Sequence, residues 1–309
     1  MTVWVTGANG FIGRYLTREL ADAGHRVHGV GHGALADLER PRRGLTSWIN
    51  GEIDAANLNL LAAEHGPPSR VFHLAGGSSV GVSIAKPLQD FYRSVVSTAQ
   101  LLEWLRGAAP ECHVIAASSA AVYGPDHRGP IAEAAVLQPM SPYGQHKLMM
   151  EQLCSSYALS FGVRTTVARL FSVYGPHLHK QLPWDICCRL ARGERTLVLG
   201  GTGDEIRDWA DVRDVARLLA KIGDEPPQQK FHIVNCGSGR ATRVAEFAGL
   251  LVKSWGSDAA VRHSGVVRAG DPFSLLADDS QLRRLPFEWR IPIEHGLAGY
   301  VRWFKDQIR

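Results

Sequence analysis

Several features that would define other protein classes are absent from this 309-residue chain. It has no apolar run of about 18 residues or more, so no transmembrane helix is expected. It begins with the strand-like Thr2-Val3-Trp4-Val5, without the basic segment and apolar stretch of a secretory leader. We therefore expect a cytoplasmic protein with no membrane partner.

Cysteine and surplus charge are also scarce. Five cysteines, none in a C-x-x-C arrangement, indicate neither a disulfide framework nor a zinc site, so we expect buried thiols and no metal. The net charge of +4 is too small to indicate nucleic-acid binding. The densest basic stretch, Arg40-Pro41-Arg42-Arg43, is short.

Short apolar runs alternate with helical stretches over the first half of the chain. Strands are expected at residues 3–5, 26–30, 47–49, 70–74, 112–117 and 163–169, and helices at 12–23, 58–65, 87–107 and 142–161. This alternation predicts an α/β fold of Rossmann type with a doubly wound parallel sheet. After about residue 170 glycine and proline become more frequent, and helices are expected at 181–192, 212–222, 244–255 and 293–304. We expect a smaller C-terminal α/β lobe there, with residues 211–235 returning to the sheet.

Three glycines lie between the first expected strand and the first expected helix. In Thr6-Gly7-Ala8-Asn9-Gly10-Phe11-Ile12-Gly13 they have the spacing G-x-x-G-x-x-G. Glycine allows a tight turn, a close approach of backbone to a pyrophosphate, and a helix N-terminus directed at the anion. A glycine-rich turn without a ligand is disfavoured by the position of the segment in a βαβ unit. The segment predicts dinucleotide binding.

The end of the second expected strand carries no acidic residue. A carboxylate at this point usually binds the adenosine ribose, but the segment reads His28-Gly29-Val30-Gly31-His32-Gly33. His32, or Arg40, Arg42 and Arg43, could instead contact the 2′-phosphate of NADP. A flexible glycine loop explains the segment equally well, so the sequence leaves both NAD and NADP open.

A Y-x-x-x-K motif, from Tyr143 to Lys147, opens the helix expected at 142–161. A spacing of four puts both side chains on one helix face, where an ammonium group lowers the pKa of a phenol and makes it usable as a general acid and base. Ser118 and Ser119 follow the strand expected at 112–117, at the sheet edge where doubly wound folds bind ligands. Each segment alone is explained by a solvated helix pair or a loop cap, but their order favours Ser119, Tyr143 and Lys147 as catalytic residues.

These motifs resemble the extended short-chain dehydrogenase/reductase family, and within it the branch of nucleotide-sugar epimerases and dehydratases. The matching segments lie at residues 6–13, 71–75, 118–124, 143–147, 169–176, 203–208, 212–216, 235–239 and 268–272. Each is modestly specific, and the ordered set is highly specific. The resemblance implies that residues 1–169 with about 211–235 form the dinucleotide-binding Rossmann domain. It implies that residues 170–210 with 236–309 form a lobe for the nucleotide-sugar substrate.

The resemblance also implies roles for individual residues. Tyr143 would transfer the proton, Lys147 would orient the nicotinamide ribose, and Ser119 would hold the reacting sugar oxygen. The residues implied in binding NAD or NADP are Gly7, Asn9, Gly10, Phe11, Ile12, Gly13, His32, Glu52, Ile53, Leu74, Ala75, Gly76, Ala117, Tyr143 and Lys147. Those implied in binding substrate are Ser78, Ser119, Ser172, Arg207 and Arg268, the two arginines as a clamp on the diphosphate.

Some positions depart from the family pattern. Ser94 and Ser172 stand where asparagine is usual, and Ala120 and Ala121 stand where the sugar 4,6-dehydratases carry acidic or other polar residues. Without a carboxylate there, the elimination of water lacks its acid/base pair, which disfavours a dehydratase.

The resemblance therefore implies a nucleotide-sugar 4-epimerase, similar to UDP-glucose 4-epimerase, that oxidises C4 transiently and reduces it again. The alternative is an NADPH-dependent reductase of a nucleotide 4-keto-6-deoxysugar, which the missing acid at Gly31 favours. A non-catalytic member would typically lack the tyrosine or the lysine, and both are present. The family also implies a homodimer formed through helices around 91–106 and 149–161, whose apolar residues are equally explained by an internal core.

Overall fold

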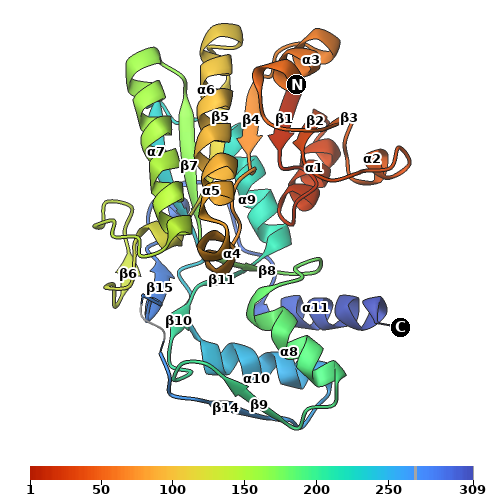
Figure 1. Cartoon of the computed structure of the whole chain (residues 1–309), viewed down its shortest axis with the longest axis vertical. Helices are drawn as coiled ribbons and strands as arrows, with labels where there is room; N and C mark the ends of the chain where they lie inside the picture. The colour runs from red at the N-terminus through yellow and green to blue at the C-terminus, as the bar shows by residue number, and fades with distance from the viewer. Residues whose placement is uncertain (268–269, 309) are drawn as a thin grey trace. The chain divides into compact units, whose positions relative to one another are not determined.

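Seven strands form the central sheet of the computed structural model, which describes residues 1–267 and 270–308 (Figure 1). They are β1 (Thr2–Thr6), β2 (Arg26–Gly31), β3 (Ser47–Asn50), β4 (Arg70–His73), β5 (His113–Ser119), β7 (Thr165–Leu170) and β12 (Phe231–Cys236). Their order is β12-β7-β5-β4-β1-β2-β3, and the neighbouring strands from β7 to β3 are parallel. The order reverses between β1 and β4, so the carboxyl ends of these strands flank the ligand-binding crevice of a doubly wound sheet. The predicted fold class is confirmed.

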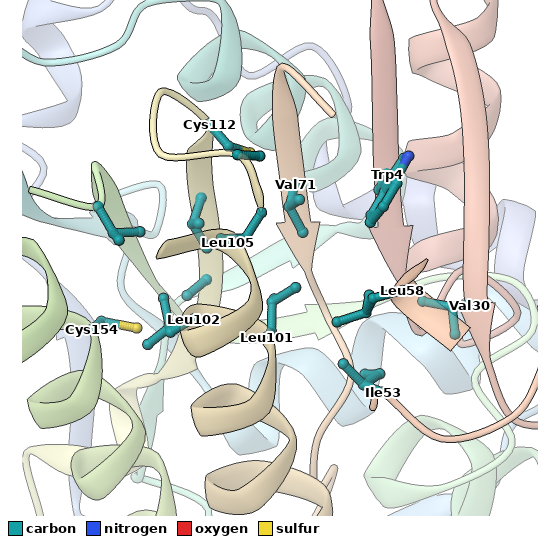
Figure 2. Packing of buried hydrophobic residues seen from close by; sticks show 14 of the residues in the cluster. Trp4, Val30, Ile53, Leu58, Val71, Leu101, Leu102, Leu105, Cys112 and Cys154 are labelled. Carbon is teal, nitrogen blue, oxygen red and sulfur yellow. The ribbon is translucent and has the colours of Figure 1, made fainter. Parts of the chain in front are cut away.

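One face of this sheet is covered by α3 (Ala55–His65), α6 (Ser97–Ala108) and α7 (Pro142–Phe161). Their apolar stripes meet alternate residues of the strands in one cluster, which includes Val114 of β5. In this cluster Leu101, Leu102 and Leu105 of α6 lie beside Val71 of β4 (Figure 2). Phe72, which points to the opposite face, packs against Gly223 of α9 (Val212–Asp224). The sheet is therefore buried on both sides, as a parallel sheet requires.

The helix predicted at residues 87–107 is divided. The structure has α5 (Pro87–Phe91), one π-helical turn (Tyr92–Val96) and α6, preceded by the short helix α4 (Val80–Ala85). Pro87 is at the first position of α5, where its missing N–H is not needed. Two further short pieces, α2 (Glu39–Arg42) and β6 (Pro130–Ile131), were not predicted from the sequence.

The chain divides into two compact units. The first contains residues 1–122, 137–170 and 216–234, and the second contains residues 123–136, 171–215 and 235–309. The second unit has a four-stranded sheet in the order β13-β10-β15-β6, with β13 at Thr242–Arg243, β10 at Ile206–Arg207 and β15 at Ser274–Ala277. It also has two strand pairs, β8 (Ser172–Tyr174) with β11 (Trp209–Asp211) and β9 (Thr196–Leu199) with β14 (Ala260–His263). Its helices are α8 (Gln181–Ala191), α10 (Val244–Trp255) and α11 (Ile293–Gln307).

The cysteines are all unpaired. Cys112, Cys154, Cys187 and Cys236 are buried and Cys188 is half-buried. Burial raises the pKa of Cys154 to about 12, so its thiol is unreactive near neutral pH. Within the described residues, no helix is both long and apolar enough to cross a bilayer, and no group of three His, Cys, Asp or Glu side chains could hold a metal.

Candidate active site

The glycine-rich loop is held in place by its own backbone. Gly7 has a φ of +68° and donates its N–H to the Val30 carbonyl at 2.8 Å. A Cβ on Gly13 would lie 2.3 Å from the carbonyl oxygen of Gly7, so only glycine lets α1 (Gly13–Asp22) begin this close to the loop. No side chain among the described residues caps α1, whose N-terminus places the positive end of the helix dipole at the loop. The loop fits a dinucleotide pyrophosphate.

Most of the other cofactor residues predicted from the sequence lie around this loop. The amides of Leu74 and Ala75 donate to Thr6, the first to its carbonyl and the second to its hydroxyl, each at 3.2 Å. Asn9 reaches the carbonyl of His32 at 3.5 Å. Phe11 packs edge-on against Tyr15 of α1. These contacts hold the segments that follow β1, β2 and β4 next to one another at the carboxyl edge of the sheet.

At the end of β2, the missing acid has a backbone explanation. Gly31 has a φ of +152°, and a Cβ there would lie 3.2 Å from the amide nitrogen of Gly7. An aspartate at this position would therefore be strained. A carboxylate near this point comes from Glu52, whose Oε2 lies 3.4 Å from His32 Nε2, and both side chains are exposed. A hollow of about 560 Å³ is lined by His32, Glu52, Lys86, Pro87, Leu88, Gln89, Tyr92 and Arg93.

The lysine and the arginine in this lining, Lys86 and Arg93, were not found from the sequence, because they lie more than 30 residues beyond Glu52. Ile53, by contrast, is buried in the hydrophobic cluster beneath the sheet edge.

The basic stretch at residues 40–43 packs elsewhere, along α1. Arg40 pairs with Asp37 at 2.7 Å, and the carbonyl of Arg42 accepts a hydrogen bond from Arg18. Burial lowers the pKa of Arg14, and the nearby charge of Arg43 lowers it further. Arg14 is thus a further member of this basic group that the sequence pattern did not indicate.

The three predicted catalytic residues come together at the end of β5. Ser141 caps α7 by accepting the N–H of Gly144 at 3.1 Å, which fixes where the helix begins. A Cβ on Gly144 would lie 2.7 Å from the Ala121 carbonyl, so glycine lets this first turn pack against the turn after β5. The Ser119 hydroxyl, which accepts the Ala121 amide at 3.2 Å, lies close enough to Tyr143 to lower the pKa of its phenol. The Lys147 Nζ donates to the Ala117 carbonyl at 2.8 Å and lies 6.0 Å from the centroid of the Tyr143 ring.

The pKa values in this group differ from the sequence expectation. Burial raises the pKa of Tyr143, and the charge of Asp90 adds to that effect, while the hydrogen bond with Ser119 opposes it. The expected lowering by Lys147 is therefore not met in the protein without cofactor, because its ammonium group binds Ala117 and burial dominates. Burial lowers the pKa of Lys147 to about 8, against the opposing charges of Asp90 and Glu151.

Behind the catalytic residues lies a buried ion pair that the sequence analysis missed. Glu151 accepts hydrogen bonds from Ser118 at 2.5 Å and from two nitrogens of Arg169 at 2.7 and 3.0 Å. Glu151 lies four residues after Lys147, so the helix face that carries Tyr143 and Lys147 continues to it. The spacing of four residues from Lys147 was the signal in the sequence that could have indicated Glu151.

The remaining predicted substrate residues have different surroundings. Ser78 is exposed in the loop after β4, in the first unit. Ser172 and Arg207 belong to the second unit, where the Ser172 amide donates to the Asp208 carbonyl and Arg207 Nη1 donates to the Ile206 carbonyl at 2.8 Å. Burial lowers the pKa of Arg207, opposed by the charges of Asp271 and Glu205. Arg268 lies outside the described residues.

Known proteins that align with nearly the whole chain include UDP-sugar 4-epimerases. A probable UDP-glucuronate 4-epimerase of Rhizobium meliloti is 28% identical, covering 100% of this chain and 98% of its own. A UDP-glucose 4-epimerase of Azospirillum brasilense is 29% identical, covering 97% and 90%.

Among solved structures, MoeE5 in complex with UDP-glucuronic acid and NAD is 30% identical with a TM-score of 0.87, covering 99% of this chain and 100% of that one. The UDP-glucose 4-epimerase of Thermotoga maritima with UDP-glucose is 27% identical with a TM-score of 0.89, and both chains are covered completely. The sequence pattern of the NAD dependent epimerase/dehydratase family matches residues 3–237. The chain belongs to this family of extended short-chain dehydrogenases/reductases.

Proposed function

We propose that the protein is a UDP-sugar 4-epimerase that uses NAD. The observation that carries the proposal is the convergence of Ser119, Tyr143 and the buried Lys147 at the end of β5, with Lys147 Nζ 6.0 Å from the centroid of the Tyr143 ring. Similarity over the whole chain to UDP-glucose and UDP-glucuronate 4-epimerases supports the reaction and the nucleotide. The glycine loop on α1 supports a dinucleotide cofactor, and NAD accompanies the UDP-sugar in the similar MoeE5 structure.

The residues of the first unit divide the chemistry among them. Tyr143 accepts the proton of the C4 hydroxyl and later returns it, while Ser119 holds the same oxygen. Lys147 donates to the nicotinamide ribose and keeps a positive charge beside the phenol. NAD, when bound, would accept the hydride that leaves C4 and return it to the other face, and its positive charge would favour the ionised form of Tyr143. Release of the 4-keto sugar before it turns over is opposed by the grip on its diphosphate, which we assign to Arg207 and Arg268.

The residues after Ser119 favour epimerisation over dehydration. Ala120 is 2% exposed and begins a 3₁₀ turn (Ala120–Val122), and neither Ala120 nor Ala121 carries a proton-transferring group. A sugar ring that only changes configuration at C4 needs no second acid/base pair there. One structural neighbour is described as an NDP-hexosamine 5,6-dehydratase. The assay should therefore also detect a product that has lost water.

The direct test is an assay of purified protein with NAD and, in turn, UDP-glucose, UDP-glucuronic acid and UDP-N-acetylglucosamine. Proton NMR of the product mixture should show the C4 epimer of at least one of them, with Tyr143→Phe inactive under the same conditions. If no sugar is interconverted, or if Tyr143→Phe retains activity, the proposal fails. A 4-keto product with loss of water would instead identify a dehydratase.

A 4-ketoreductase that uses NADPH is the second candidate. The absence of a carboxylate at Gly31 favours it, as does the basic group of Arg14, Arg40 and Arg43 along α1. It predicts stoichiometric oxidation of NADPH with a nucleotide 4-keto-6-deoxysugar, followed at 340 nm. An epimerase consumes no cofactor, so this measurement separates the two.

The division of labour between the two units belongs to the same proposal. We assign the cofactor to the first unit and the nucleotide sugar to the second.

We also propose a homodimer, supported by the apolar side chains that α7 leaves exposed at Met149, Leu159 and Phe161. Sedimentation analysis of the wild type beside a Leu159→Glu/Phe161→Glu variant tests it, and an unchanged mass would refute it.

A further inference from the structure

A buried carboxylate–imidazole pair lies next to the lysine of the active site. Asp90 of α5 is 3% exposed, and its Oδ2 is 2.6 Å from Nδ1 of His146, the residue of α7 directly before Lys147. The ring of Phe91 packs edge-on against the imidazole. Neither Asp90 nor His146 has a role in the proposed reaction. Burying a carboxylate is costly unless it is paired, so its presence here calls for a reason.

Two glycines after β4 bring this carboxylate and the lysine to the same loop. A Cβ on Gly76 would lie 3.0 Å from Lys147 Nζ, and a Cβ on Gly77 would lie 1.8 Å from Asp90 Oδ1. The second oxygen of Asp90 is buried and accepts no hydrogen bond from any described residue. Asp90 is therefore held by one oxygen. Its other oxygen approaches Gly77, and Lys147 Nζ approaches the adjacent Gly76.

The other groups around Lys147 leave Asp90 as its counter-charge. Burial lowers the pKa of His73 in β4 to about 3 and raises that of Cys154 in α7 to about 12, so both are uncharged near pH 7. The charge of Glu151 is matched by the two hydrogen bonds from Arg169. Tyr143 is neutral because burial raises its pKa, and Arg93, three residues after Asp90, is exposed and lines the hollow beside Glu52.

We propose that Asp90 is the counter-charge that keeps Lys147 protonated and that His146 holds its carboxylate in position. Both are then positioning residues for the lysine that contacts the cofactor. The proposal rests on the proposed function only for the role of Lys147 in cofactor binding. The interaction between Asp90 and Lys147 does not require a bound cofactor. Burial lowers the pKa of Lys147 to about 8, and Asp90 is the strongest of the charges that oppose this lowering.

The test measures the titration of Lys147 directly in the protein without cofactor. The chain has only seven lysines, so NMR of protein labelled with carbon-13 at lysine Cε gives few signals, and Lys147→Arg identifies the one to follow. We expect a midpoint near pH 8 in the wild type and a midpoint lower by about one unit or more in Asp90→Asn. The matched control is Glu103→Gln on α6, which removes an exposed carboxylate and should leave the midpoint unchanged.

A second variant keeps the test informative if Asp90→Asn does not fold. Replacing both Asp90 and His146 by leucine removes the buried pair without leaving either partner alone, a change that folded proteins often tolerate. The same downward shift is expected in this double variant. Midpoints within about 0.3 unit of the wild type in Asp90→Asn and in the double variant would overturn the proposal.

Calorimetric titration with NAD across the same pH range separates this proposal from the proposed function. If the charge of Lys147 supports cofactor binding, NAD affinity falls with rising pH at the NMR midpoint, and the fall moves to lower pH in Asp90→Asn. A shifted NMR midpoint without a matching shift in NAD affinity would keep Asp90 as the counter-charge and would refute the role of Lys147 in cofactor binding.

Discussion

Replacing Arg169 by methionine would leave the carboxylate of Glu151 buried without its cation. Arg169 is 1% exposed and Glu151 is 3% exposed, and the change removes two charged hydrogen bonds of 2.7 and 3.0 Å. Breaking such a buried pair by deleting one partner costs about 3–5 kcal/mol of unfolding free energy. Glu151 can reduce this cost only by taking up a proton, which would also weaken its bond from Ser118.

Urea denaturation of the wild type, Arg169→Met and a double variant with Glu151→Leu measures this coupling. The double variant should recover at least about 2 kcal/mol of the loss, because no buried charge is left alone and leucine fills the space. Arg106→Met, which breaks the exposed pair with Glu103 on α6, is the matched control and should change stability little. A loss below about 1 kcal/mol in Arg169→Met, or a double variant no more stable than the single one, would refute the reasoning.

Three further predictions follow from the same unit. Tyr143→Phe should lower kcat by about 10²-fold or more while NAD binding, measured by calorimetry, stays within a few-fold of the wild type, because only proton transfer is lost. An equal loss in both would mean that the phenol mainly binds cofactor. Gly13→Ala should abolish NAD binding, because its Cβ would meet the Gly7 carbonyl at 2.3 Å, and retained binding in a folded variant would contradict the loop geometry. Burial lowers the pKa of His73 to about 3 and that of His113 to about 4. Both stay neutral in the folded state and titrate near 6.5 when unfolded, so their contribution to stability should be constant above about pH 6.5 and fall toward pH 3–4. Unfolding midpoints unchanged between pH 7 and 5 would argue against this.

The fold was predictable because its signals are local and repeated. Each strand from β1 to β7 in the central sheet coincides with a short apolar run, and the glycine loop marks where α1 begins. The π-helical turn at Tyr92–Val96 was not predictable, because one extra residue in a turn leaves the apolar pattern of a long helix nearly intact. The sequence therefore predicted one helix where the structure has three pieces.

The candidate site was predictable only where its residues form motifs. Ser119, Tyr143 and Lys147 lie in recognisable segments, and the structure brings them together. The pair of Asp90 and His146 was invisible, because its members are 56 residues apart and belong to no shared motif. The pKa of Tyr143 was misjudged because spacing along a helix gives proximity to a lysine but not the extent of burial.

The geometry of Gly31 bears on how this protein could change its cofactor. Its φ of +152° means that an acidic side chain cannot simply be substituted at the end of β2. A carboxylate that binds the adenosine ribose would therefore have to come from another position, and Glu52 beside His32 is one such carboxylate. A redesign for another cofactor would replace the whole connection that follows β2, or would use His32 and Glu52 to bind the adenosine ribose. Natural divergence toward another cofactor would need the same change of backbone.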